Sequence, residues 1–209
     1  MATYYRYLKI ILMVFGLGIS VHSASKTVVF LGDSLTAGYG IDPAQSYPAL
    51  IEQRLRKDHL DWQVVNAGVS GDTTQGGLNR LNWILKRRPD VVVIALGAND
   101  GMRGIPTAVI SNNLVAIIDT CRKKGSGVLL MGIRIPTNYG KAYEDAIVDT
   151  LERVSKDKKV PYLPFYIRDV AAIPSLNIAD GIHPNVAGHQ KVANRVYVFI
   201  KPYLTGRKP

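Results

Sequence analysis

The sequence predicts one α/β domain, a three-layer α/β/α sandwich with about five parallel strands between two layers of helices. Short runs of apolar, often β-branched residues alternate with amphipathic stretches of helix length, which is the pattern of a parallel sheet with helical crossovers. The short runs are apolar at consecutive positions, as in strands covered on both faces. No linker, repeat or low-complexity segment divides the 209 residues, of which 47% are apolar and 20% charged, so one domain accounts for the chain.

The expected strands and helices alternate along the chain. We expect strands at residues 27–31, 63–67, 91–96 and 128–133, and a weaker one at 161–163. We expect helices at residues 47–58, 78–86, 108–124, 142–158 and 186–203. Ligands of an open parallel sheet bind beyond the carboxyl ends of its strands, so a functional site is expected in the loops that follow the strands.

Residues 1–24 have the pattern of a secretory signal peptide. Arg6 and Lys9 precede a twelve-residue apolar run, and small residues follow at 23–25. This order of charged, apolar and small residues is typical of a cleavable signal, and the run is short for a membrane span; an uncleaved membrane anchor is the alternative. We therefore expect residues 25–209 to form the domain and to be periplasmic or secreted.

The formal net charge of +10 makes nucleic acid, an anionic membrane and acidic ligands candidate partners. Basic runs at residues 86–88, 122–124 and 156–159 close three expected helices, where cations complement the helix C-terminal dipoles. Weak contact with an anionic membrane surface is the alternative for these runs. No aromatic residues interleave with them, so nucleic acid is not expected as a partner. The single cysteine, Cys121, lies in an apolar-periodic stretch and is expected to be buried.

Polar residues suited to catalysis lie in four loops of the expected site. The loops read Gly32-Asp33-Ser34-Leu35 after the first strand, Gly68-Val69-Ser70-Gly71-Asp72 after the second, Gly97-Ala98-Asn99-Asp100 after the third, and Asp180-Gly181-Ile182-His183-Pro184 before the last helix.

The four loops together supply the groups that acyl transfer needs. Ser34 lies on a tight turn and becomes a nucleophile only if a base takes its proton, a role that His183 can fill. Asp180, three residues before His183, can orient the imidazole and stabilise its protonated form. The backbone N–H groups of Gly71 and Ser34 and the side-chain amide of Asn99 can stabilise the oxyanion of a tetrahedral intermediate.

Each of these residues also has a structural interpretation. Asp33 and Ser34 suit helix caps, Asn99 suits an Asx turn, and Asp180 with Gly181 is a common turn pair. Their joint occurrence, in this order and at one end of the sheet, favours the catalytic interpretation. No His, Cys and carboxylate set has metal-ligand spacing and no glycine-rich lysine loop follows a strand, so neither a metal nor another cofactor is expected.

These four blocks, in this order, resemble those of the SGNH, or GDSL-type, hydrolases. The segments AGVSGDTTQGGLNRL at 67–81, GANDGMRG at 97–104 and RIPTNYG at 134–140 are similar to secreted bacterial arylesterases and multifunctional acyl-CoA thioesterase/lysophospholipases. The resemblance covers the chain after about Lys26 and implies a flavodoxin-like fold. Ala179 stands where the thioesterase members carry an acidic residue, which favours the arylesterase branch.

The resemblance implies a serine hydrolase that acts on esters, thioesters and lysophospholipids through an acyl-enzyme intermediate. It implies the triad Ser34, Asp180 and His183 and an oxyanion hole of Ser34, Gly71 and Asn99. Apolar residues expected to border the substrate are Met102, Ile133, Ile135, Pro136 and Tyr139. We expect a monomer. A carbohydrate O-acetylesterase and a non-catalytic small-molecule binding domain are the alternative functions.

Overall fold

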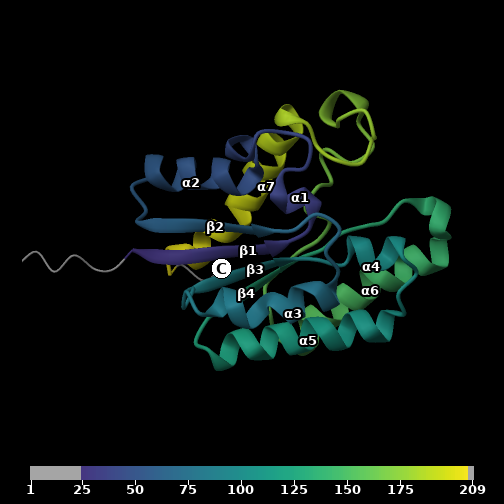
Figure 1. Cartoon of the computed structure of the whole chain (residues 1–209), viewed down its shortest axis with the longest axis horizontal. Helices are drawn as coiled ribbons and strands as arrows, with labels where there is room; N and C mark the ends of the chain where they lie inside the picture. The colour runs from purple at the N-terminus through teal and green to yellow at the C-terminus, as the bar shows by residue number, and fades with distance from the viewer. Residues whose placement is uncertain (1–24, 207–209) are drawn as a thin grey trace, which may run out of the picture.

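A five-stranded parallel sheet in the order β2-β1-β3-β4-β5 forms the middle layer of the structure (Figure 1). The structure, a computed structural model, describes residues 25–206, and the expected signal segment lies outside the described residues. The strands are β1 (Lys26–Gly32), β2 (Trp62–Gly68), β3 (Val91–Ala95), β4 (Gly127–Met131) and β5 (Tyr162–Leu163). This order is that of flavodoxin-like folds, so the expected fold class is confirmed.

Helices cover both faces of this sheet (Figure 1). On one face α2 (Tyr47–Lys57) packs beside α7 (Val186–Leu204). On the other face α5 (Thr107–Lys123) lies between α3 (Thr74–Leu85) and α6 (Lys141–Asp157). The shorter elements are α1 (Ser34–Ala37) after β1, α4 (Ala98–Met102) after β3, and the 3-10 turns η1 (Pro43–Gln45), η2 (Thr137–Tyr139) and η3 (Pro174–Leu176).

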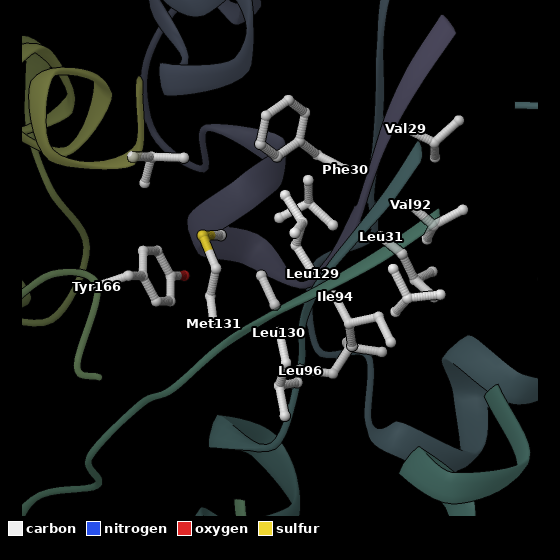
Figure 2. Close-up of a cluster of buried hydrophobic side chains, with 14 of the residues drawn as sticks. Val29, Phe30, Leu31, Val92, Ile94, Leu96, Leu129, Leu130, Met131 and Tyr166 are labelled. Carbon is white, nitrogen blue, oxygen red and sulfur yellow. The ribbon is translucent and has the colours of Figure 1, made fainter. Parts of the chain in front are cut away.

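The central strands are buried on both faces, as the continuous apolar runs predict. Figure 2 shows that successive residues of β1 point to opposite sides of the sheet: Phe30 lies on the side of Met131 and Tyr166, whereas Val29 and Leu31 lie on the other side. All five side chains are buried. Because close-packed layers hold this sheet from both faces, the loops at its carboxyl edge start from fixed positions.

The edge strand β2 differs from the expectation of strands buried on both faces. Val64 and Val65 are only partly buried, because β2 has a neighbouring strand on one side only. At the opposite edge β5 has only two residues, which agrees with the weak pattern predicted there. The apolar content of β2 therefore did not reveal its position at the edge.

The start of α3 was also predicted incorrectly, since the helix begins at Thr74 rather than at residue 78. Thr73 forms the N-cap, and its hydroxyl accepts a hydrogen bond from the Gly76 N–H at 3.1 Å. A Cβ on Gly77 would lie 2.4 Å from a methyl carbon of Leu96, so glycine lets the first turn approach the sheet closely. A turn made of small and polar residues carries no apolar periodicity by which it could be recognised.

Cys121 is buried within α5, as expected from its apolar surroundings. Burial raises the pKa of its thiol to about 12, so the side chain stays protonated at neutral pH. Among residues 25–206 no helix combines the length and apolar character needed to cross a bilayer.

Candidate active site

The carboxyl ends of β1 and β3 form the point at which the connections of the sheet diverge. From β1 the chain crosses to β2 on one side, and from β3 it continues to β4 on the other. In doubly wound sheets a crevice opens at this point, because the loops leave in opposite directions. Ser34 directly follows β1 and Asn99 lies in the loop after β3, so both begin at this crevice.

Ser34 is held at the start of α1 by its two preceding residues. A Cβ on Gly32 would lie 2.0 Å from the Thr36 hydroxyl oxygen, so the strand can turn into the helix only with glycine there. Asp33 is the N-cap, and its Oδ1 accepts a hydrogen bond from the Leu35 N–H at 3.0 Å. Ser34 therefore lies in the first turn of a capped helix, with its position fixed by the backbone on both sides.

His183 reaches Ser34 from the other end of the chain. Its Nε2 lies 2.8 Å from the Ser34 Oγ, and its Nδ1 lies 2.6 Å from the Asp180 Oδ2. The second carboxylate oxygen of Asp180 accepts hydrogen bonds from the N–H groups of Ile182 and His183 at 2.9 and 3.0 Å. The three side chains therefore form one continuous hydrogen-bonded row.

The Asp180 carboxylate is stabilised in its ionised form. Partial burial opposes ionisation, but the hydrogen bonds from the backbone N–H groups of His183 and Ile182 and from the imidazole outweigh it. Together these contacts lower the pKa of Asp180 to about 2. A negative charge beside Nδ1 stabilises a proton on the imidazole, which is what a base that receives the serine proton requires.

The three groups expected to donate to an oxyanion lie in the loops that follow β1, β2 and β3. Among residues 25–206, the N–H groups of Ser34 and Gly71 donate to no protein acceptor, and Gly71 adopts a left-handed conformation with φ of +80°. One N–H of the Asn99 amide donates to the Asp72 carbonyl at 2.9 Å, which holds the side chain and leaves its second N–H available. The Arg103 guanidinium donates to the Gly71 carbonyl at 2.8 Å, which fixes this peptide from the outside.

Asp72, the acid in the loop after β2, is engaged away from His183. It forms an ion pair of 2.7 Å with Arg80, which also donates to the Gly32 carbonyl. This pair connects the loop of Gly71 to the end of β1.

Asp100, on α4, belongs to a buried polar cluster that sequence reasoning missed. Its carboxylate accepts from the Thr74 N–H and hydroxyl at 2.8 and 2.5 Å, and Asn113 donates to the same hydroxyl. The cluster joins α4 to the start of α3, so it fixes the two loops that carry Asn99 and Gly71. Asp180 is thus the carboxylate that contacts the imidazole. In the described part of the chain, no group of three or more His, Cys, Asp or Glu side chains is placed to hold a metal ion.

A small cavity of about 60 Å³ lies beside Ser34 and His183. Four of the five apolar residues expected to border the substrate line it, namely Met102, Ile133, Ile135 and Pro136. Tyr139 does not line it, because it lies on the η2 turn with its side chain exposed. Apart from Ser34, Asn99 and His183, the other residues that line the cavity, none of which was assigned to it from the sequence, are Asp33, Leu35, Ala98, Arg134, Ile167 and Ile182.

Tyr39 is a further neighbour of His183 that sequence reasoning missed. Its ring centroid lies 4.7 Å from that of the imidazole, with the two planes tilted by 45°. The flanking residues Gly38 and Gly40 both have a positive φ, and a Cβ on Gly40 would lie 2.7 Å from Ile178. This turn brings the loop after α1 against the loop of His183, and the Gly-Tyr-Gly sequence was the available signal.

Comparison with known proteins agrees with this geometry. The sequence profile of the GDSL-like Lipase/Acylhydrolase family matches residues 30–191. The chain belongs to this family. The matched region begins within β1 and includes Ser34, Asn99, Asp180 and His183, so the GDSL-type hydrolase family spans every part of the site described above.

Several relatives of this GDSL-type hydrolase are named esterases. Esterase TesA of Pseudomonas aeruginosa is 39% identical over 87% of this chain and 91% of the relative. An arylesterase of Vibrio mimicus is 40% identical over 83% of this chain and 87% of the relative, and thioesterase 1/protease 1/lysophospholipase L1 of Escherichia coli K12 is 38% identical over 87% and 86%. A crystal structure of TesA superposes with a TM-score of 0.82 at 39% identity and covers 85% of this chain and 99% of that one.

Proposed function

We propose that this GDSL-type hydrolase cleaves carboxylic esters and thioesters, lysophospholipids included, by transferring the acyl group to Ser34. The observation that carries the proposal is the row of Ser34, His183 and Asp180, with separations of 2.8 and 2.6 Å. A hydroxyl becomes a competent nucleophile when a base receives its proton, and an imidazole held by a carboxylate is such a base. The names of the relatives, which include arylesterase and thioesterase, support this class of substrate.

In the proposed first step, the Ser34 Oγ attacks the carbonyl carbon while His183 Nε2 takes the hydroxyl proton. The carbonyl oxygen becomes an oxyanion, and the N–H groups of Ser34, Gly71 and Asn99 are the donors proposed to stabilise it. Asp180 stabilises the imidazolium that forms. The imidazolium then gives its proton to the departing alcohol or thiol, and the acyl group stays on Ser34 as an ester.

In the second step, water attacks this acyl-enzyme and His183 takes the proton of the water. Collapse of the second tetrahedral intermediate releases the carboxylic acid, and the proton returns to the Ser34 Oγ. Each proton transfer uses the same nitrogen, and every proposed group belongs to the chain itself. The mechanism therefore requires no cofactor.

The cavity supports broad acceptance of acyl groups. Most of the residues that line it are apolar, which suits an acyl chain. Of its polar side chains, Arg134 is the one outside the loops of Ser34, Asn99 and His183, and it is paired with Glu144. One methylene in an apolar pocket changes the transition-state energy by about 1–3 kcal/mol at most. We expect a gradual dependence of kcat/KM on acyl length, weak activity on lysophospholipids and poor activity on acetylated sugars.

The test is a substrate panel compared in the wild type and Ser34→Ala. The panel contains aryl esters of increasing acyl length, an acyl thioester, a lysophospholipid and an acetylated oligosaccharide. We expect Ser34→Ala to lower kcat on every substrate by at least about 10³-fold. An acetylated oligosaccharide as the best substrate would instead identify a carbohydrate O-acetylesterase, and a wild type inactive on the whole panel would identify a binding domain.

A chelator tests the absence of a metal from the mechanism. EDTA should leave kcat/KM unchanged, because the proposed donors and acceptors are side-chain and backbone groups. Activity that is lost with EDTA and restored by a divalent ion would contradict the mechanism. We further propose that the protein is exported to the periplasm or medium, on the basis of the signal-like pattern of residues 1–24. We also propose that it acts as a monomer, because one chain contains every group of the proposed mechanism.

A further inference from the structure

The end of the molecule opposite the candidate active site carries three basic runs, which together form a basic face. We define it as nine cations, namely residues 86–88 and 122–124 together with Lys156, Lys158 and Lys159, which directly follow or close α3, α5 and α6. The exposed acid Asp157 interrupts the third run. These helices lie side by side in one layer, and their carboxyl ends reach the edge of the sheet where the strands begin (Figure 1). The three runs, far apart in the sequence, therefore meet at one end of the structure.

Hydrogen bonds fix these runs against one another. The Arg122 guanidinium donates to the Lys159 carbonyl at 3.1 Å, which joins the second run to the third. Ser126, two residues after the second run, donates to the carbonyl of Pro89 at 2.6 Å, and Pro89 directly follows the first run. These bonds connect the chain segments that carry the three runs.

Most of the cations on this face are exposed and lack an acidic partner. Within residues 25–206, Lys156 pairs with Glu152 and Lys158 pairs with Asp119, whereas no salt bridge within 4.0 Å involves residues 86–88, 122–124 or Lys159. The dipole of a helix is equivalent to about −0.5 elementary charge at its carboxyl end, and its influence is confined to the last turn. The remaining unpaired charges are therefore available to an anionic partner.

Trp83 lies next to the first run and is 63% exposed. It lies in the last turn of α3, and the Arg87 guanidinium is 5.8 Å from the centroid of its ring. An indole has an apolar body and one N–H donor, and tryptophan is enriched where apolar and aqueous phases meet. An exposed tryptophan beside a cationic cluster is the combination that binds the headgroup region of an anionic bilayer.

We propose that the basic face docks on a bilayer of anionic phospholipids, with Trp83 at headgroup depth. Because the candidate active site lies at the opposite end of the sheet, it faces away from the bilayer in this orientation. The docked enzyme then takes substrates from the aqueous side, and it does not attack the lipids on which it sits. Docking depends on charge and on one indole, and it is independent of the proposed catalytic function.

A membrane fits this surface better than nucleic acid. Single-stranded nucleic acid is typically held in a cationic groove, where several aromatic rings stack on successive bases. Here the cations lie on the ends of helices, and Trp83 is the exposed tryptophan of the described chain, Trp62 being buried. A bilayer needs only a charged surface and an amphipathic anchor.

The experiment is sedimentation of the purified protein with phosphatidylcholine vesicles, with and without phosphatidylglycerol. The variants are the double reversal Arg87→Glu/Lys123→Glu, the substitution Trp83→Phe, and a matched control, Lys191→Glu, an exposed cation on α7 away from the basic face. All are made in the same chain, so any contribution of the N-terminal segment cancels. Tryptophan emission, and its quenching by brominated lipid, report the depth of Trp83.

We expect binding to vesicles with phosphatidylglycerol, weakened by salt because exposed charges are screened over about 8–10 Å. The double reversal should reduce the partition coefficient at least tenfold, and Lys191→Glu should leave it unchanged. Quenching by brominated lipid should disappear in Trp83→Phe. Hydrolysis of a soluble aryl ester should be equal in free and docked protein.

Three results would overturn the proposal. Equal binding to both vesicle types, or a double reversal without effect, would exclude the basic face as the contact. Single-stranded DNA that displaces the protein from vesicles and quenches Trp83 more strongly than lipid does would identify a nucleic-acid surface instead. Faster cleavage of a lysophospholipid in the docked bilayer than in solution would show that the active site faces the membrane. A catalytically inactive protein would contradict the proposed function while leaving the binding result intact.

Discussion

The buried carboxyl of Asp33, next to Ser34, leads to a quantitative prediction about stability. Asp33 is 2% exposed, and burial raises its pKa from 3.8 to about 7. The nearby carboxylates of Asp72 and Asp100 act in the same direction, whereas the Leu35 N–H that it caps favours the ionised form. Asp33→Asn removes the charge and keeps an oxygen that can cap the same N–H, since asparagine and aspartate are equally good N-caps.

The sign of the effect follows from proton binding. Between pH 3.8 and about 7 the folded state holds a proton on Asp33 that the unfolded state has released, so the free energy of unfolding falls as the pH rises through this window. One pKa unit corresponds to about 1.4 kcal/mol, so the whole window corresponds to about 4 kcal/mol. Asparagine does not titrate, so Asp33→Asn does not lose this free energy of unfolding as the pH rises. It should therefore match the wild type near pH 4 and exceed its stability above pH 7 by up to about 4 kcal/mol.

The assay is urea unfolding of the wild type and Asp33→Asn across this pH range. The matched control is Asp42→Asn, because Asp42 caps η1 through the Ala44 N–H but is exposed. The difference between Asp33→Asn and the wild type should grow with pH, and that for Asp42→Asn should stay close to zero. A difference for Asp33→Asn that does not change with pH, or a variant less stable than the wild type at pH 8, would refute the reasoning.

Further predictions concern the groups around the imidazole. Asp180→Asn should lower kcat by up to about 10⁴-fold. Asp72→Asn should lower kcat by about tenfold at most, because a partly exposed ion pair contributes about 1 kcal/mol. Equal losses of kcat in steady-state kinetics would show that Asp180 is not the acid that orients His183. Tyr39→Ala removes the ring that contacts His183 and should lower kcat by about threefold to tenfold. Tyr39→Phe keeps the ring and should leave kcat unchanged. Equal losses of kcat in the two variants would show that the ring contact does not contribute to catalysis. Burial, and secondarily the charge of His183, lowers the pKa of His189 to about 4, so only the unfolded state takes up its proton as the pH falls from 6.5 to 4. In urea unfolding, the wild type should therefore lose about 2 kcal/mol more stability than His189→Gln between pH 7 and pH 5; parallel losses would show that His189 is not the group responsible.

The features that sequence predicted well are those set by local pattern. Consecutive apolar residues identified the strands, and parallel strands bring the loops after them to one edge, so Ser34 and Asn99 could be placed at the same crevice from order alone. The spacing of Asp180 and His183 on one loop predicted their contact in the same way. These are consequences of chain direction and of hydrogen bonds between residues close in sequence.

The features that were missed depend on contacts between distant residues. Asp100 and Thr74 are 26 positions apart, and no periodicity indicates that their side chains meet. Tyr39 and Tyr139 look alike in sequence, each beside a glycine, yet Tyr39 contacts His183 and Tyr139 lies outside the cavity. The direction in which a loop side chain points depends on packing that the sequence does not display.

Trapping the acyl-enzyme tests the central claim most directly. The protein is mixed with an aryl ester, quenched in acid during steady-state turnover, and analysed by intact mass and peptide mapping, with Ser34→Ala treated identically. We expect a mass increase of one acyl group on the peptide that contains Ser34, formed and lost at rates consistent with turnover, and no increase in Ser34→Ala. An acyl group on another residue, or undiminished turnover by Ser34→Ala, would contradict it.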